Sequence, residues 1–234
     1  MQSFLKHFII DSYTTGLMII KQQFMKLLKQ LYHPSEFFNL IWKNVRAFCW
    51  QMYLKSKGVT VGTNVILKGK PIILRFTGAI RLGNNVTLLS NGRRYHTSVY
   101  APTRLMTDEK ENAIIEIGDN TRINGASIHA TEKISIGRNC LIAANVTIID
   151  SDGHGLSPVQ RNLINPVSQS VIIEDNVWIG INSIILKGVR IGRNSVIGAG
   201  SVVTKDIPSN CVAAGNPARV IKTFTHEHGQ INEY

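Results

Sequence analysis

The stretch 171-VIIEDNVWIGINSIILKGVRIGRNSVIGAGSVVTKD-206 repeats every six residues. The third place of each six is aliphatic in every copy: Ile173, Ile179, Ile185, Ile191, Ile197 and Val203. The first place is always Val or Ser, and Asn, Gly or Asp closes each six. An α-helix would need a period of 3.6 residues. The pattern therefore predicts a short strand and a turn, repeated in phase.

The same period continues towards the N-terminus. It runs through "ISIGRN", "CLIAAN" and "VTIIDS" (134–151) and through "IEIGDN" and "TRINGA" (115–126), with weaker copies at 59–64 and 80–85. Three sixes make one triangular coil, and stacked coils pair as parallel strands roughly 4.8 Å apart. Gly and Asn at the turns accept positive φ. The sequence predicts an all-β core, a parallel β-helix, over residues 58–222.

Two segments interrupt the repeat, at 90–113 and 150–170. The first contains Arg93, Arg94, Tyr95 and His96, which either contact an acceptor or are simply solvated. The second begins within "VTIIDSDGHGLSP" (146–158), where His154 follows two aspartates. A loop inserted in a solenoid leaves the coil while the core continues beneath it. We expect His154 to lie at the wall of the β-helix, beside a groove.

The hexads of the "IGRN" type and the closing run "GAGSVVTKDIPSNCVAAGNPARVI" (198–221) resemble the left-handed β-helix acyltransferases. The resemblance is to galactoside and maltose acetyltransferases and to the sugar O-acetyltransferases of polysaccharide biosynthesis. It implies a left-handed coil and a homotrimer. It also implies acetyl transfer from acetyl-CoA to a hydroxyl of a sugar or cell-surface glycan precursor, without a covalent intermediate or a metal.

The resemblance also assigns candidate site residues. "DSDGH" matches the loop that carries the family's general base, which implies that role for His154. An imidazole titrating near neutral pH suits the removal of a hydroxyl proton. Asp150 or Asp152 would orient the imidazole through Nδ1, or both are ordinary turn residues. Asn124 matches an acceptor-binding Asn only with a one-residue gap, and it is otherwise a turn residue.

The resemblance places the residues that bind the cofactor in the last coils. The small residues of 198–201, among them Ala199, would let a slender pantetheine arm approach the backbone. Thr204, Lys205, Arg219 and Lys222 match the positions where the family holds CoA, and cations there would meet its phosphates. Lys222 replaces an Arg of the galactoside enzymes, so a point charge replaces a bidentate fork. The family's oxyanion donor, a backbone N–H, maps to Ile181.

The segments outside the repeat are basic. The chain has a formal charge of +11, and residues 1–57 hold eight Lys or Arg and two acidic residues. Residues 17–32 and 35–58 predict two helices separated by Pro34. These helices pack on the β-helix or a neighbouring subunit, or they contact an anionic membrane surface. No nucleic-acid-binding motif is present. Residues 223–234 form a tail, and three unpaired cysteines favour a reducing, cytoplasmic setting.

Other functions remain open at this point. N-acetylation of an amino sugar, or acylation of another small molecule, would use the same mechanism. A γ-type carbonic anhydrase shares the β-helix but needs three histidines around zinc, and the seven histidines here lack the required spacing. A non-catalytic β-helix scaffold is the remaining alternative.

Overall fold

The computed structural model describes residues 34–92, 97–109, 112–159, 161–162, 167–224, 226–227 and 230–231. The expected helix at 17–32 and the four candidates Arg93, Arg94, Tyr95 and His96 lie outside these residues. By contacts the chain divides into two compact units, residues 1–48 and 49–234. The sequence placed the boundary at residues 57 and 58, whereas compactness places it within the helix that precedes the repeat.

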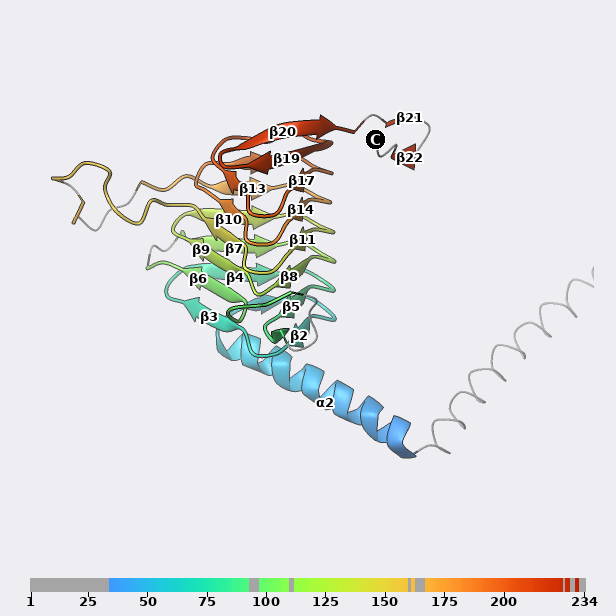
Figure 1. Cartoon of the computed structure of the whole chain (residues 1–234). Helices are drawn as coiled ribbons and strands as arrows, with labels where there is room; N and C mark the ends of the chain where they lie inside the picture. Colours follow the sequence, from blue (N-terminus) through green and yellow to red (C-terminus); the bar gives the residue numbers. More distant parts are fainter. Residues whose placement is uncertain are drawn as a thin grey trace, which may run out of the picture. The chain divides into compact units, whose positions relative to one another are not determined.

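The repeat forms three parallel sheets, and successive strands pass from one sheet to the next (Figure 1). The first sheet contains, in spatial order, β1 (Thr60–Val61), β4 (Ala79–Leu82), β7 (Ile114–Ile117), β10 (Lys133–Ile136), β13 (Val171–Ile173) and β16 (Arg190–Ile191). The second contains β2 (Ile66–Lys68), β5 (Thr87–Leu89), β8 (Arg122–Asn124), β11 (Leu141–Ile142), β14 (Trp178–Ile179), β17 (Val196–Ile197), β19 (Cys211–Gly215) and β20 (Ala218–Thr223). The third contains β18 (Val202–Val203), β15 (Ile184–Ile185), β12 (Thr147–Ile149), β9 (Ser127–Ala130), β6 (Arg104–Thr107) and β3 (Ile72–Arg75).

Only two pairings among the described strands are antiparallel. They are β19 with β20, and the small C-terminal pair β21 (His226–Glu227) with β22 (Gln230–Ile231). The first six coils each give one strand to every sheet and stack as a three-sided solenoid, and β19 and β20 extend only the second sheet. This confirms the predicted fold class, a left-handed parallel β-helix with a helical extension.

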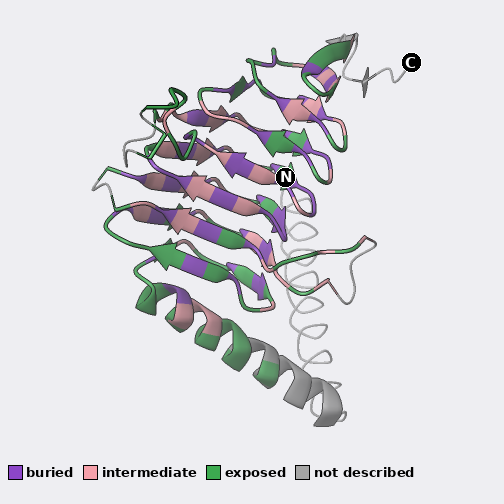
Figure 2. Ribbon diagram, turned by 60° about the vertical axis from the view of Figure 1, so that its left-hand side comes forward, coloured by how far each residue is buried: buried purple, intermediate pink, exposed green. Residues whose placement is uncertain are grey.

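The core is one column of aliphatic side chains inside the three sheets. Residues classed as buried are purple on the ribbon of Figure 2 and recur along the strands of the stack. The third places of the six in-phase hexads are all buried: Ile173, Ile179, Ile185, Ile191, Ile197 and Val203. The first places are buried too, including Ser183, Ser195 and Ser201. A serine is tolerated there because its hydroxyl donates to a backbone carbonyl, as Ser183 does to Gly198 at 3.0 Å.

Asparagines make turns at two corners of the solenoid: seven lie between the first and second sheets, and two, Asn145 and Asn182, lie between the second and third. Nine described Asn residues have positive φ, as the turn pattern predicts. Side-chain amides of successive coils hydrogen-bond to one another, for example Asn64 to Asn85 at 2.9 Å and Asn85 to Asn120 at 3.0 Å. Such a ladder satisfies polar groups that would otherwise compete with the parallel pairing.

The described helix α2 (Pro34–Ser56) begins at a proline, which fits the first turn of a helix because its missing N–H needs no partner there. It ends before Gly58, whose φ of +71° closes the last turn with a 2.8 Å bond from its N–H to the Lys55 carbonyl. Leu54 is fully buried, and the Tyr53 hydroxyl donates to the Pro71 carbonyl at 3.0 Å. The last turns of α2 therefore belong to the β-helix unit.

The two interruptions differ from each other. The loop predicted at 90–113 is shorter than expected, because β6 (Arg104–Thr107) continues the third sheet with Leu105 and Thr107 turned inward. Between the end of β12 and the start of β13, the described residues of the second interruption leave the stack (yellow in Figure 1). A bridge between Ser151 and Ser168 and a 2.8 Å bond from Gln169 N–H to the Asp150 carbonyl close its neck.

Candidate active site

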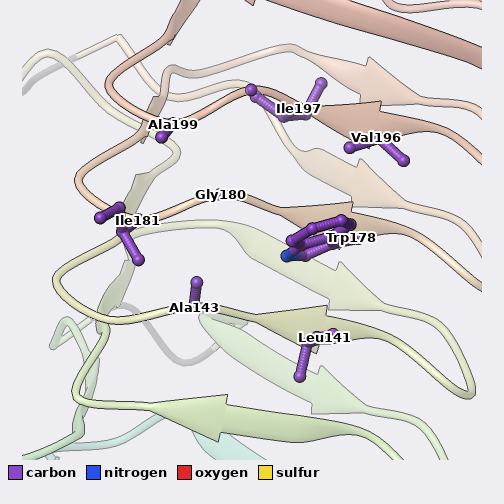
Figure 3. Close-up of a pocket in the computed structure, with 9 residues that line it drawn as sticks. Leu141, Ala143, Trp178, Gly180, Ile181, Val196, Ile197 and Ala199 are labelled. Atoms are coloured by element: carbon purple, nitrogen blue, oxygen red, sulfur yellow. The ribbon is translucent and has the colours of Figure 1, made fainter. Parts of the chain in front are cut away.

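A groove lies on the outside of the second sheet, where that sheet turns towards the third (Figure 3). Its volume is about 290 Å³. Leu141, Trp178 and Val196 stand in register on β11, β14 and β17 and form its apolar wall. The lining consists of Leu141, Ala143, Trp178, Gly180, Ile181, Val196, Ile197, Gly198 and Ala199.

The floor of the groove is made of small residues because consecutive coils approach closely there. A Cβ on Gly180 would lie 2.6 Å from the Ala199 nitrogen, and one on Gly198 would lie 2.8 Å from the Ala214 Cβ. Larger side chains would push the coils apart.

Two sequence-predicted cofactor residues line this groove, Ile181 and Ala199. Ile181 accepts a 2.8 Å hydrogen bond from Gly200 N–H through its carbonyl. Within the described part of the chain, the N–H groups of Ile181 and Ala199 donate no backbone hydrogen bond. Both N–H groups can therefore donate to a ligand.

Lys222 extends the same outward column. Val196 pairs with Val212 on β19, and Val212 pairs with Lys222 on β20. Arg219 is on the same strand, exposed, and its Nη1 donates to the Ala218 carbonyl at 2.9 Å. Beyond the groove, the outward column thus passes from apolar residues to a cation, which suits a ligand with a slender apolar arm and an anionic head.

Thr204 and Lys205 lie elsewhere. They follow β18 of the third sheet and are exposed at the corner where the chain turns towards the first sheet. Lys205 is therefore not beside Ile181 or Ala199 within one chain. Thr204 and Lys205 are thus separated from the other four predicted cofactor residues, which lie on the second sheet or at its corner with the third.

His154 is exposed on the 150–170 loop, at that second corner. Its Nδ1 lies 3.2 Å from the carbonyl oxygen of Arg161. A carbonyl can only accept, so this contact requires the proton to be on Nδ1 and leaves Nε2 unprotonated in the neutral ring. A lone pair on Nε2 is what a general base needs.

The two aspartates near His154 have other partners. Asp150 is fully buried and accepts hydrogen bonds from Thr131 N–H at 2.7 Å and Glu132 N–H at 2.8 Å. Burial raises the pKa of the Asp150 carboxyl, and these N–H groups oppose that rise. Asp152 pairs with Lys187 at 2.5 Å. The group that contacts the His154 ring is the Arg161 carbonyl, a partner that residue type could not reveal.

Asn124 lies at the end of β8, in the column that continues through Ala143 and Gly180. It is only 1% exposed, and its Nδ2 donates to the Ile142 carbonyl at 3.1 Å. Its Oδ1 has no hydrogen-bond partner among the described residues. An acceptor could reach this oxygen only after the covering residues moved.

A polar cluster at the base of the 150–170 loop was not found from the sequence. His129 Nε2 lies 3.4 Å from Asp108 Oδ1, an ion-pair distance without hydrogen-bond alignment. The Thr131 hydroxyl donates to Asp108 Oδ2 at 2.9 Å and lies 3.1 Å from the Ser151 hydroxyl. His129 could have indicated this cluster in the sequence, because it is a histidine at an outward position of β9, in register with Met106 and Ile149. No three His, Cys, Asp or Glu side chains gather as a metal site among the described residues.

The fold and the groove define a hexapeptide-repeat solenoid. Residues 170–205 match the family model described as bacterial transferase hexapeptide (six repeats), and residues 114–149 match the hexapeptide repeat of succinyl-transferase. The putative lipopolysaccharide biosynthesis O-acetyl transferase WbbJ of Escherichia coli (strain K12) is 35% identical over 167 residues, which are 67% of this chain and 78% of that protein. The chain belongs to the hexapeptide-repeat transferase family.

Two further similarities agree with this assignment. Galactoside O-acetyltransferase of Lactococcus lactis subsp. lactis (strain IL1403) is 47% identical over 103 residues, which are 42% of this chain. This chain spans about half of that relative's length, 49%. The crystal structure of a hexapeptide-repeat-containing acetyltransferase from Vibrio cholerae has a TM-score of 0.50 at 25% identity and covers 70% of this chain and 73% of its own.

Proposed function

We propose that the protein is an acetyl-CoA-dependent O-acetyltransferase that acts on a hydroxyl of a sugar or cell-surface glycan precursor. The observation that carries the proposal is the groove on the second sheet, with its apolar wall at Trp178 and its glycine floor, together with the cation Lys222 further along the same outward column. Relatives named as sugar and lipopolysaccharide O-acetyltransferases support the acceptor class.

His154 is the proposed general base. Acetyl-CoA supplies an activated acyl group as a thioester. Nε2 of His154 takes the acceptor's hydroxyl proton as that oxygen bonds to the acyl carbon, and the imidazolium returns the proton to the departing thiolate. The Arg161 carbonyl holds Nδ1–H and keeps the ring in the required tautomer. The Ile181 N–H would donate to the carbonyl oxygen as negative charge develops on it.

The proposed site needs two copies of the chain. The groove lies where the second sheet meets the third, whereas the His154 loop leaves between the third sheet and the first. Outward residues of the second and third sheets include exposed Leu141, Trp178 and Ile184, while the first sheet presents ion pairs. Apolar contact between two different faces is heterologous, and a rotation of 120° between copies would close it into a three-membered ring. These features support the trimer that the resemblance implies.

A screen tests the reaction. The purified full chain is mixed with acetyl-CoA and with nucleotide sugars or surface polysaccharides, and the released CoA thiol and acetylated product are measured. We expect acetylation of at least one hydroxyl acceptor and intersecting initial-velocity patterns, because direct transfer needs both substrates bound. Parallel patterns would indicate a covalent intermediate and overturn the mechanism. Failure to bind acetyl-CoA would overturn the function.

Complementation tests the shared site. His154→Ala removes the base, and Ala199→Trp fills the groove, so each variant alone should be inactive. If each site takes its histidine from one protomer and its groove from another, oligomers co-assembled from the two variants regain part of the activity. Absence of recovery in mixed oligomers of verified composition would place both halves of the site in one chain.

A further inference from the structure

Helix α2 carries an apolar stripe with no partner among the described residues. Trp42 is 67% exposed, Phe48 64%, Met52 51% and Val45 45%. Cys49 is exposed as well. At about 100° per residue, these five residues fall within an arc of about 120° along one side of the helix. We call Trp42, Val45, Phe48, Cys49 and Met52 the α2 stripe.

The opposite side of the same helix is already used. Leu54, fully buried, lies about 180° from the centre of the stripe on the helical wheel. Trp50, about 40° from Leu54 on the wheel, also packs against the core cluster, and Tyr53 does so from a position between the stripe and Leu54. The stripe is therefore not the side by which the last turns of α2 pack on the β-helix.

Cations flank the stripe. Arg46 and Lys55 are both exposed and lie within about 40° of its two edges. Residues 1–57 as a whole hold eight basic and two acidic residues. An apolar arc that contains Trp and Phe and is bordered by Lys and Arg has the composition of a helix lying in a lipid headgroup layer. The long basic side chains can reach the phosphates while their stems stay in the apolar zone.

We propose that the α2 stripe docks on an anionic lipid surface. Charge complementarity selects this occupant over a second copy of the chain. Two copies packed stripe to stripe would bring Arg46 and Lys55 of each against the same cations of the other, which is repulsive. On an anionic bilayer the same cations are attracted, each by roughly 1 kcal/mol.

Vesicle flotation of the full chain tests the proposal. The probes are vesicles of phosphatidylcholine alone and vesicles that also contain phosphatidylglycerol. We expect the protein to float with the anionic vesicles and to do so more weakly with the neutral ones. The variant Trp42→Ala, Phe48→Ala, Met52→Ala keeps a strong helix former at each place, and its vesicle partition coefficient should fall by at least tenfold.

A matched pair of charge variants separates local attraction from net charge. Arg46→Ala with Lys55→Ala should lower partition into anionic vesicles by about fivefold per charge at low salt. The loss should shrink at high salt. Arg81→Ala with Arg138→Ala changes the net charge equally but lies on the first-sheet side, and it should leave partition unchanged. If both pairs act alike, attraction is not local to α2 and the proposal fails.

Other results would also overturn the proposal that the α2 stripe docks on lipid or would test whether it depends on the proposed function. Wild-type protein that ignores anionic vesicles overturns the proposal, and so does a triple variant that floats as well as wild type. If light scattering showed instead that the triple variant loses mass while wild type ignores vesicles, the occupant would be a second copy. Acetyl-CoA binding in solution should be unchanged in every α2 variant, so a negative flotation result is independent of the proposed function.

Discussion

The first and second sheets have similar inward columns, yet their outward residues differ. Outward places of the first sheet carry Arg81, Glu116 and Lys133, with both cations within 2.9 Å of the carboxylate. Outward places of the second sheet carry Leu141, Trp178 and Val196. The inward residues are interchangeable between the sheets because they only fill the core. The outward residues determine whether a face meets water or a ligand and a neighbour.

The largest expected loss of activity comes from a residue on neither sheet, because His154 lies on the loop between the third sheet and the first. His154→Ala should lower kcat by roughly 10²–10⁴-fold and leave the fold and acetyl-CoA affinity intact, because the residue is exposed on a loop. Arg161→Ala is the matched control, since it keeps the backbone carbonyl that contacts Nδ1. Steady-state kinetics with the identified acceptor measure both. Near-wild-type turnover of the His154 variant would remove the general-base role.

Inward substitutions should act alike in the two sheets. Ile173→Ala on β13 and Ile179→Ala on β14 each delete buried methyl groups, and each should lower the free energy of unfolding by about 2–5 kcal/mol. Denaturant unfolding followed by circular dichroism measures the change. If the free energy of unfolding fell by less than about 1 kcal/mol for one variant but not for the other, the inward columns of the first and second sheets would not be equivalent.

Outward cations should matter only on the ligand side. Lys222→Ala should weaken acetyl-CoA binding by about tenfold, and Arg219→Ala should also weaken it. Lys205→Ala should weaken it as well, through the corner that a second copy of the chain brings to the groove in the proposed shared site. All three effects should be larger at low salt, because screening reduces each charge's contribution. Arg81→Ala on the first sheet serves as the control and should not change affinity. Calorimetry giving unchanged affinity in all three variants would refute the proposed direction of the cofactor along the groove.

The smallest effect is expected on the first sheet. Lys133 and then Arg81 hold the pKa of Glu116 below its usual range. The stabilisation from this carboxylate is therefore complete above the pKa of the unfolded chain and is lost as pH falls through the lowered folded value. Glu116→Gln should cost less than about 1 kcal/mol at neutral pH, because the pair is exposed. Thermal unfolding of both proteins should converge in acid, and a difference that grows there would contradict this account.

The inward positions were predictable because a six-residue period leaves only one set of side chains inside. Positive φ at the corner asparagines followed from the same pattern. β6 was missed because "RLMT" follows a charged, irregular stretch and lacks a neighbouring in-phase hexad. The burial of Asp150 and the contact between His154 and the Arg161 carbonyl depend on how a loop folds back, and no local pattern encodes that.

The outward column from Trp178 through Val196 and Val212 to Lys222 crosses three strand spacings. At roughly 4.8 Å each, these amount to about 14 Å. Backbone hydrogen bonds between the strands, and not side chains, fix the length of each step along this column. The distance between the apolar wall and the cationic end can therefore change only by whole strands. Adding one coil between them would lengthen this distance by one strand spacing, so a ligand of fixed length would lose contact with the apolar residues or with Lys222.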